Sequence, residues 1–358
     1  MAYTTINKST DYFSSNLYTG TGSALTVTTG HQSDFIWIKQ RTTVRPHCLF
    51  DSVNSSNFAG GNSKYLVSNT TANLTSNNAT QITANSSTGF SIGTDNSDQI
   101  NNNGDTAVAW SWKANGQGSA NTDGTINTTY TSADTTSGFS ISTYTGTGSA
   151  GTIGHGLGAK PAMIIAKRLT GSAEAWTVYH QSLDASAPQD KYLHLNSTDA
   201  VMDSAGMWND TAPTTSVFSV GSTGVTNGSG GTFVAYCFAE KQGFSKFGSY
   251  TGAGGGGQPF IYTGFKPAFI ITRNVTSAVD WGMFDNKRNE YNVVQNVLLP
   301  NNSAAETTGT AKYFDFLSNG FKVKNDSLQY NGTNEKHIYM AFAEAPLVGS
   351  NNVPCTAR

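Results

Sequence analysis

The sequence has few charged residues. Aspartate, glutamate, lysine and arginine make up 12% of the 358 residues, and the formal net charge is −2. This is about half the charged fraction of an average soluble domain. It provides neither the basic surface that binds nucleic acid nor a polybasic patch for an anionic membrane. Solubility must come from serine, threonine, asparagine and glycine, which suits a salty exterior because salt screens surface ion pairs.

Cysteine is scarce, and long hydrophobic runs are missing. Cys48, Cys237 and Cys355 are too few for a disulfide framework, and we expect the first two to be small buried residues. No run approaches the roughly 20 apolar residues of a transmembrane helix. The segment after Met1 is polar, unlike a signal peptide. We therefore expect no membrane insertion.

Helical periodicity is also missing. The apolar runs have the length of strands, roughly four to eight residues, and are rich in β-branched and aromatic residues. Glycine, asparagine, serine or threonine bounds each run. With 37% hydrophobic residues the chain can bury cores, so its low charge does not indicate disorder. We predict an all-β protein.

Internal repetition is what the sequence has in abundance. One opening motif recurs as YTGTGS at 18–23 and 144–149 and as YTGAGG at 250–255. A closing segment recurs as AVAWSWK at 107–113, FVAYCFAE at 233–240 and HIYMAFAE at 337–344. Between them, FIWIK, MIIAK and FIITR stand at 35–39, 163–167 and 269–273. Such fixed-period similarity indicates a repeated structural unit, and we predict three tandem β-sandwich repeats of jelly-roll or concanavalin-like type.

The repeat marks predict domain boundaries. The three sandwiches and a short tail are expected at 1–113, 138–242, 243–348 and 349–358. Residues 114–137 between the first two contain Ile126 and Tyr130 as their only large apolar residues, so we expect a flexible polar linker. No such segment separates the second and third repeats. We therefore predict that these two form a rigid pair and that the first is tethered.

The closing segments alternate large and small side chains. Trp112, Phe238 and Phe342 lie on the large face, whereas Ser111 and Cys237 lie on the small one. Because side chains alternate along a strand, we predict that each large face enters the core of its own sandwich.

No catalytic constellation is apparent. The alternating acids typical of jelly-roll glycoside hydrolases are missing, and the glycine-rich turns lead into strands rather than phosphate-binding helices. Of the histidines, only His180 and His194 are expected on neighbouring strands, without a third ligand at zinc spacing. The acidic, asparagine-rich turn at 95–105 leaves a weak calcium site open. We predict no catalytic residues, no resident metal and no cofactor.

Two loops are candidates for surface contacts. Trp208 and Asn209 lie in a loop without a counterpart in the other repeats, whereas the remaining repeat tryptophans fall on strands and are expected in cores. Asp95, Asp98 and Asp105 belong to the second loop. Since rigid scaffolds often present function on loops, we predict exposed contacts at these five residues.

Several motifs together resemble a known repeat domain. YTGTGS, a proline-initiated I-I-x-K strand, W-x-V-Y-H, L-x-L-N-x-T and F-V-A-Y-C-F-A-E are similar to an uncharacterised repeat domain of virion proteins in marine tailed bacteriophages. The similarity extends from Tyr3 to Glu344. It implies a concanavalin-like β-sandwich and a structural or fibre role, with no known catalytic residues.

The resemblance sets the functional expectation. We expect a non-enzymatic protein on the virion surface, as a tail- or head-attached fibre, spike or decoration protein that contributes to host adhesion. It would be assembled in the host cytoplasm and then exposed to the extracellular medium. Its expected partners are other virion proteins, host surface glycan and further copies of itself. A free-standing lectin or glycan-active enzyme of the same fold is the alternative.

Overall fold

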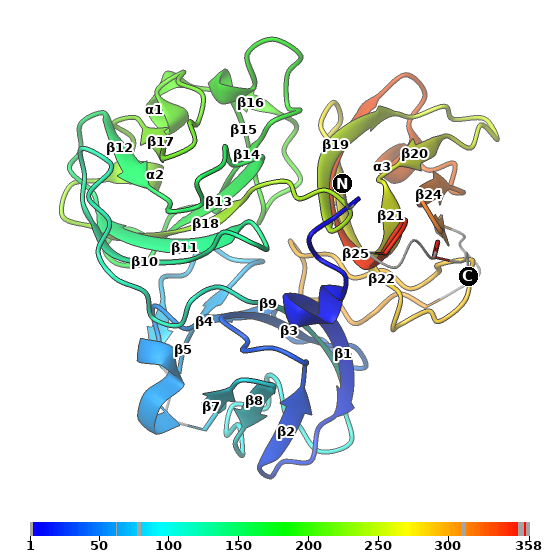
Figure 1. Cartoon of the computed structure of the whole chain (residues 1–358), viewed down its shortest axis with the longest axis horizontal. Helices are drawn as coiled ribbons and strands as arrows, with labels where there is room; N and C mark the ends of the chain where they lie inside the picture. Colours follow the sequence, from blue (N-terminus) through cyan, green and yellow to red (C-terminus); the bar gives the residue numbers. More distant parts are fainter. Residues whose placement is uncertain (1–2, 62, 77–79, 309–312, 350–353, 356–358) are drawn as a thin grey trace.

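The computed structural model is built almost entirely from antiparallel strands, and it describes residues 3–61, 63–76, 80–308, 313–349 and 354–355. Three lobes surround a common centre (Figure 1). Each lobe is a sandwich of one large and one small sheet. The predictions of an all-β protein and of β-sandwich architecture are confirmed.

The first lobe pairs the large sheet β1-β9-β3-β4-β5-β6 with the small sheet β2-β8-β7. Its elements are η1 (Ser9–Asp11), β1 (Phe13–Thr19), β2 (Leu25–Thr28), β3 (Phe35–Gln40), β4 (Cys48–Asp51), η2 (Ser56–Gly61), β5 (Lys64–Val67), β6 (Thr75–Ser76), β7 (Ile82–Ser86), β8 (Gly89–Ile92) and β9 (Thr106–Trp112).

The second lobe pairs β10-β11-β18-β13-β14-β15-β16 with β12-β17. Its elements are β10 (Thr128–Asp134), β11 (Phe139–Thr145), β12 (Gly151–Gly154), β13 (Met163–Arg168), β14 (Thr177–His180), η3 (Pro188–Asp190), β15 (Lys191–His194), β16 (Met202–Asp203), α1 (Ala205–Trp208), β17 (Val217–Val220), α2 (Gly224–Asn227) and β18 (Thr232–Phe238).

The third lobe pairs β19-β25-β21-β22 with β20-β24-β23. Its elements are β19 (Ser245–Thr251), β20 (Phe260–Tyr262), β21 (Phe265–Asn274), β22 (Gly282–Asp285), β23 (Phe314–Leu317), β24 (Gly320–Val323), α3 (Leu328–Asn331) and β25 (Lys336–Pro346). In every lobe the opening strand pairs with the closing strand, which pairs in turn with the strand that carries the central sequence mark.

The recurring opening motif anchors a buried asparagine turn. In the first lobe the Tyr18 hydroxyl donates to the Ile100 carbonyl at 2.7 Å, and the Thr21 N–H donates to the Asn101 side chain at 2.9 Å. The tyrosines that open the other two motifs make the same bond at 2.7 and 2.8 Å, and a buried asparagine again accepts from the motif backbone. The motif is therefore a structural clamp of the sandwich.

The large faces of the closing strands meet in one central core. The Trp112 ring lies 6.3 Å from that of Phe238 and 5.7 Å from that of Phe342, and the two phenylalanine rings are 6.2 Å apart. The prediction of three separate cores for these side chains is wrong. The small faces enter the sandwiches instead, where Ala109 and Cys237 belong to cores within single lobes. Small residues there let the second sheet pack closely.

The segment predicted to be a flexible linker carries structure. Residues 128–134 form β10, which pairs with β11 along its length. Upstream, Ile126 forms a parallel bridge with Ile153 of β12. The expected tethering of the first lobe is also wrong, because Trp112 packs against both other lobes. Of the predicted tail, residues 350–353 and 356–358 lie outside the described residues.

Candidate functional site

The three lobes are joined in a ring by equivalent backbone hydrogen bonds. The Leu74 N–H of the first lobe donates to the Leu169 carbonyl of the second at 3.1 Å. The second lobe reaches the third through Val201 and Val275 at 3.0 Å. The ring then closes from the third lobe to the first, where the Glu306 N–H donates to the Arg41 carbonyl at 2.8 Å.

In each large sheet, the strand that follows the one with the central sequence mark (β4, β14 or β22) ends in a polar side chain that bonds to the next lobe. Asp51 accepts from the Tyr236 hydroxyl at 2.8 Å, and Asp285 accepts from the Trp110 indole N–H at 3.1 Å. In the second lobe this position is His180, whose imidazole Nε2 lies 3.1 Å from the Tyr339 carbonyl. The equivalent closing strand has Met340, which has no hydrogen to donate, so histidine suits this joint as the donor to the backbone.

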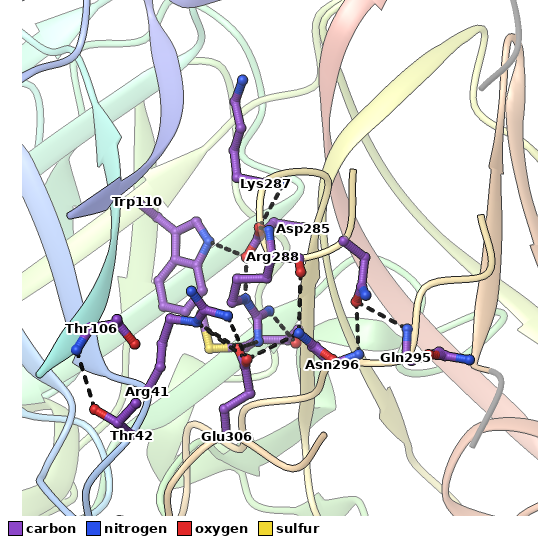
Figure 2. A network of polar contacts seen from close by, with 12 residues as sticks. Arg41, Thr42, Thr106, Trp110, Asp285, Lys287, Arg288, Gln295, Asn296 and Glu306 are labelled. Atoms are coloured by element: carbon purple, nitrogen blue, oxygen red, sulfur yellow. Dashed lines mark hydrogen bonds and ion pairs between the residues drawn. The ribbon is translucent and has the colours of Figure 1, made fainter. Parts of the chain in front are cut away.

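The joint that closes the ring contains a buried ionic network (Figure 2). The Arg288 guanidinium contacts Asp285 at 2.5 Å and Glu306 at 3.0 Å, and lies over the Trp110 ring at 5.5 Å. Arg41 of the first lobe binds Glu306 from the other side at 2.8 Å. Because the chain connects the first lobe to the second and the second to the third, this joint has no covalent link, and the network holds its two lobes together.

The network has the residue types of an acid–base catalytic site, but its side chains are not accessible to a substrate. The Arg288 and Asp285 side chains are fully buried and that of Glu306 is 3% exposed. Burial would lower the Arg288 pKa, but the carboxylates of Asp285 and Glu306 raise it above its ordinary value. Each carboxylate is therefore paired with a permanent cation and shielded from solvent. This arrangement stabilises a joint and offers no proton to a substrate.

Five histidines are buried in the neutral form. Burial lowers the pKa of four of them to about 4; these are His31, His155, His180 and His337. Burial also lowers the pKa of the fifth, His47, well below its ordinary value. His180 and His194 lie on the neighbouring strands β14 and β15 as predicted, but His194 pairs with Thr177, at the far end of β14 from His180. Cys48 and Cys237 are buried as predicted, and burial raises the pKa of both thiols.

Acid should destabilise the protein through the first four of these imidazoles. Their pKa is near 4 when folded and about 6.5 when unfolded, so the unfolded state binds more protons between these values. Their contribution is fully present above pH 6.5 and is lost as the pH falls toward 4, at about 1.4 kcal/mol per pH unit for each histidine. Urea unfolding at pH 7, 6 and 5 measures this dependence. A free energy of unfolding that stays constant over this range would contradict it.

Trp208 is not the exposed contact that the sequence predicts. It is 2% exposed, and its ring packs edge-on against Phe218 at 6.4 Å in the core of the second lobe. The loop that carries it forms α1, capped by the Ser204 side chain, so the tryptophan turns toward the sheet. Asn209 at the end of α1 is exposed.

The acidic loop is also partly structural. Asp95 is buried, and its carboxylate accepts from the backbone N–H groups of Ile100 and Asn101 at 2.6 and 3.0 Å. This bonding fixes the asparagine turn that receives Tyr18. Asp98 is exposed and Asp105 is half-buried, so of the three aspartates proposed as contacts in this loop, these two reach solvent.

Exposed aromatic residues occur instead on the small sheet of the third lobe. Phe260 and Tyr262 lie on the outward face of β20 and are 48% and 55% exposed, whereas Ile261 between them points into the sandwich. Tyr262 borders a cleft of about 390 Å³ whose other lining includes Tyr3, Glu240 and polar or glycine residues; these are Gln242, Gly243, Ser245, Lys246, Thr263 and Gly264. An aromatic platform beside acid, amide and ammonium groups can contact a polar ligand.

The other two lobes show that the fold does not require these aromatics. Strand register places Phe260 and Tyr262 opposite Lys322 and Gly320. The corresponding positions are Thr26 and Thr28 in the first lobe and Thr152 and Gly154 in the second. The sequence does carry a signal for this patch: when FIYTG at 260–264 is aligned with TVTTG at 26–30, aromatic residues stand where the first lobe has threonines.

The Tyr3 side chain fixes one wall of the cleft. Its hydroxyl donates to the Gly264 carbonyl at 2.7 Å. Burial, followed by hydrogen bonding with Tyr262, raises the pKa of the Tyr3 phenol to about 12. Lys246, which also lines the cleft, contacts Glu240 at 2.6 Å, and each side chain stays about one-third exposed. The cleft therefore presents two phenol side chains and a solvent-accessible ion pair.

Comparison with known proteins identifies the family. A family model described as a domain of unknown function, DUF7483, matches residues 8–346. The chain belongs to this family. The match extends through all three lobes, in agreement with their shared core. No curated protein matches the chain.

Within the described ranges, no helix has the length and apolar character needed to span a membrane. In the same part of the chain, no group of three or more histidine, cysteine, aspartate or glutamate side chains is arranged to hold a metal ion.

Proposed function

We propose that this DUF7483 protein is a non-enzymatic structural protein on the surface of a marine tailed-phage virion, where it contributes to host adhesion. The proposed role in adhesion rests on one observation. Phe260 and Tyr262 are exposed at positions where the other lobes have threonine or glycine. Exposed aromatics that the scaffold does not need are suited to contact a partner.

The joints support the non-enzymatic part of the proposal. Asp51, His180 and Asp285 are buried and hold neighbouring lobes together. These side chains have a structural role between the lobes, and their burial keeps substrates away from them. A core shared by all three lobes also suits a particle that must withstand an external medium.

Purified particles test the virion assignment. Mass spectrometry should detect the chain in gradient-purified virions, and imaging with an antibody should place it on the head or the tail. Its presence only in the soluble fraction of infected cells would contradict the assignment. Hydrolysis of host polysaccharide by the pure protein would overturn the non-enzymatic reading in favour of the glycan-active alternative.

Truncating the aromatic patch should weaken adhesion without unfolding the protein. Particles carrying Tyr262→Ala together with Phe260→Ala should adsorb to host cells several-fold more slowly, because stacking surface is lost. Stability should change by no more than about 0.5 kcal/mol per exposed site. Adsorption kinetics and thermal melting measure the two effects.

Tyr291→Ala is the matched control, since Tyr291 belongs to the same lobe and is 77% exposed but does not line the cleft. It should leave adsorption unchanged. Equal losses from the control and the patch variant would show that the effect is not specific to the cleft.

A further inference from the structure

The cleft beside Tyr262 is assembled from segments that are distant in sequence. Its lining comes from Tyr3, the connection between the second and third lobes at 240–243, the start of β19 and the segment 262–264 that leads from β20 to β21. Its volume of about 390 Å³ lies within the range of small-ligand sites, about 300–1,000 Å³. The size of the cleft therefore suits a compact ligand, such as the end of a chain molecule.

Two hydrogen bonds from the N-terminal segment fix the shape of the cleft. The Tyr3 hydroxyl donates to the Gly264 carbonyl at 2.7 Å, and the Thr4 hydroxyl donates to the Gln242 carbonyl at 2.7 Å. Gly243 permits this close approach, because a Cβ atom there would lie 2.9 Å from that of Thr4. Two separate segments of the lining are thus held in place before a ligand arrives, which lowers the entropy lost on binding.

Tyr262 presents a fixed aromatic ring to the cleft. A hydrogen bond joins its hydroxyl to that of Tyr3, so the polar end of the side chain has a partner while 55% of the residue stays exposed. The residue opposite Tyr262 on β24 is Gly320, which has no side chain to lie against the ring. A tyrosine ring provides contact area at low entropy cost because it has few rotatable bonds. Tyr262 is therefore suited to pack against the flat face of a ligand.

The charged groups of the cleft balance each other. Glu240 and Lys246 are the charged residues among the described residues that line it, and their side chains are in contact at 2.6 Å. Each stays about one-third exposed, so the carboxylate retains acceptor sites and the ammonium retains donor hydrogens. A charged ligand would be attracted by one group and repelled by the other. Two neighbouring hydroxyl groups, in contrast, can bond to both.

A neutral sugar ring has the two properties that this cleft matches. One face of a pyranose carries C–H groups that pack on an aromatic ring, and its rim carries neighbouring hydroxyls that both donate and accept hydrogen bonds. Phe260 lies on the same face of β20 as Tyr262, about 7 Å along the strand, and is 48% exposed. A second sugar unit of the same chain can therefore contact Phe260.

We propose that this cleft binds neutral pyranose units of a host-surface glycan, with one ring stacked on Tyr262 and its hydroxyls hydrogen-bonded to Glu240 and Lys246. The inference rests on the proposed adhesive function and names the ligand class of the same site. One such contact is weak, with a dissociation constant on the order of millimolar. Several copies on one particle strengthen attachment through effective concentration.

Saturation-transfer NMR on the purified protein tests the ligand class. The probes are tetramers of glucose, galactose and mannose, with a galacturonate tetramer as the charged counterpart. At least one neutral tetramer should bind, and the galacturonate tetramer should bind at least about tenfold more weakly. Binding of the neutral tetramer should change less than about twofold between about 0.05 and 0.5 M NaCl, because it forms no ion pair. Preferential binding of galacturonate would overturn the proposal.

Tyr262→Thr tests the aromatic platform, because the corresponding residue of the first lobe is Thr28. The substitution should weaken binding of the neutral tetramer at least about tenfold through loss of the ring. Tyr262→Phe keeps the ring and should bind within about threefold of the native protein. Tyr291→Ala, exposed but outside the cleft, should bind like the native protein. Binding that survives Tyr262→Thr would place the saccharide site elsewhere and contradict the proposal.

Glu240→Gln tests the charge balance. The amide keeps hydrogen-bonding capacity, whereas Lys246 loses its ion-pair partner and the cleft gains a net positive charge. The galacturonate tetramer should then bind at least about threefold more tightly than it binds the native protein. Galacturonate binding that does not respond to Glu240→Gln would show that this ion pair does not contact the ligand, against the proposal.

Particle adsorption separates this inference from the function on which it rests. If no neutral tetramer binds while particles with Phe260→Ala and Tyr262→Ala still adsorb slowly, the saccharide ligand is wrong and the adhesive function stands. Adsorption that protease treatment of the host cells abolishes would then identify a protein receptor. If these particles adsorb normally while the pure protein binds a neutral tetramer through Tyr262, the ligand class is correct and the adhesive function is wrong.

Discussion

Phe238→Ala should destabilise all three lobes together. Its ring contacts Trp112 of the first lobe and Phe342 of the third as well as Phe139 of its own. Truncating a buried aromatic residue costs about 3–5 kcal/mol of unfolding free energy, a large share of the stability of an average protein. Hydrogen exchange should therefore show lower protection in β3 and β21 as well as in β18.

The control for this prediction is Leu328→Ala in the third lobe. Leu328 is 51% exposed, so its truncation should change stability by no more than about 0.5 kcal/mol. Unchanged exchange in β3 of the Phe238→Ala variant would show that the first lobe is stable by itself. The shared core would then contribute little to cohesion between the lobes.

Asp285→Ala should open the joint that closes the ring. The substitution removes an acceptor from the Trp110 indole and one of the two carboxylates around Arg288. Breaking a buried ion pair by removing one partner costs about 3–5 kcal/mol because the remaining charge stays buried. Urea unfolding should report a loss of this size, accompanied by a change in tryptophan fluorescence.

A surface pair offers the matched control. Asp203 contacts Lys191, and its side chain is 61% exposed, so Asp203→Ala should cost at most about 1 kcal/mol. Replacing Asp285 and Arg288 together by leucine and methionine should restore part of the stability, since no unpaired charge is left. Equal effects of Asp285→Ala and Asp203→Ala would contradict a structural role for the network.

The joints between the three lobes also explain why the polar residue at the strand end differs from lobe to lobe. Asp51, His180 and Asp285 occupy corresponding positions yet differ in chemistry. Their partners account for the difference: a hydroxyl, a backbone carbonyl and an indole N–H. The hydrogen-bonding group of the next lobe therefore determines which polar side chain suits each strand end.

Surface contacts were the least predictable part of the candidate site. Trp208 lies in a loop by sequence, but α1 places it against the sheet, and no local pattern reports the neighbour that covers it. Phe260 and Tyr262 look like any alternating strand, in which aromatics are usually buried. Their exposure depends on β20 forming the edge of a small sheet whose inner face is already filled.

The sequence by itself determined the strands, their antiparallel sandwiches and the positions of the opening and closing marks. These follow from local rules, because side chains alternate along a strand and glycine-rich turns end it. The alternation of Trp112 with Ser111 could likewise be read directly. Only the tertiary structure decided which face enters which core. Both faces of the closing strands are buried, and the surface that covers the large one comes from lobes distant in sequence.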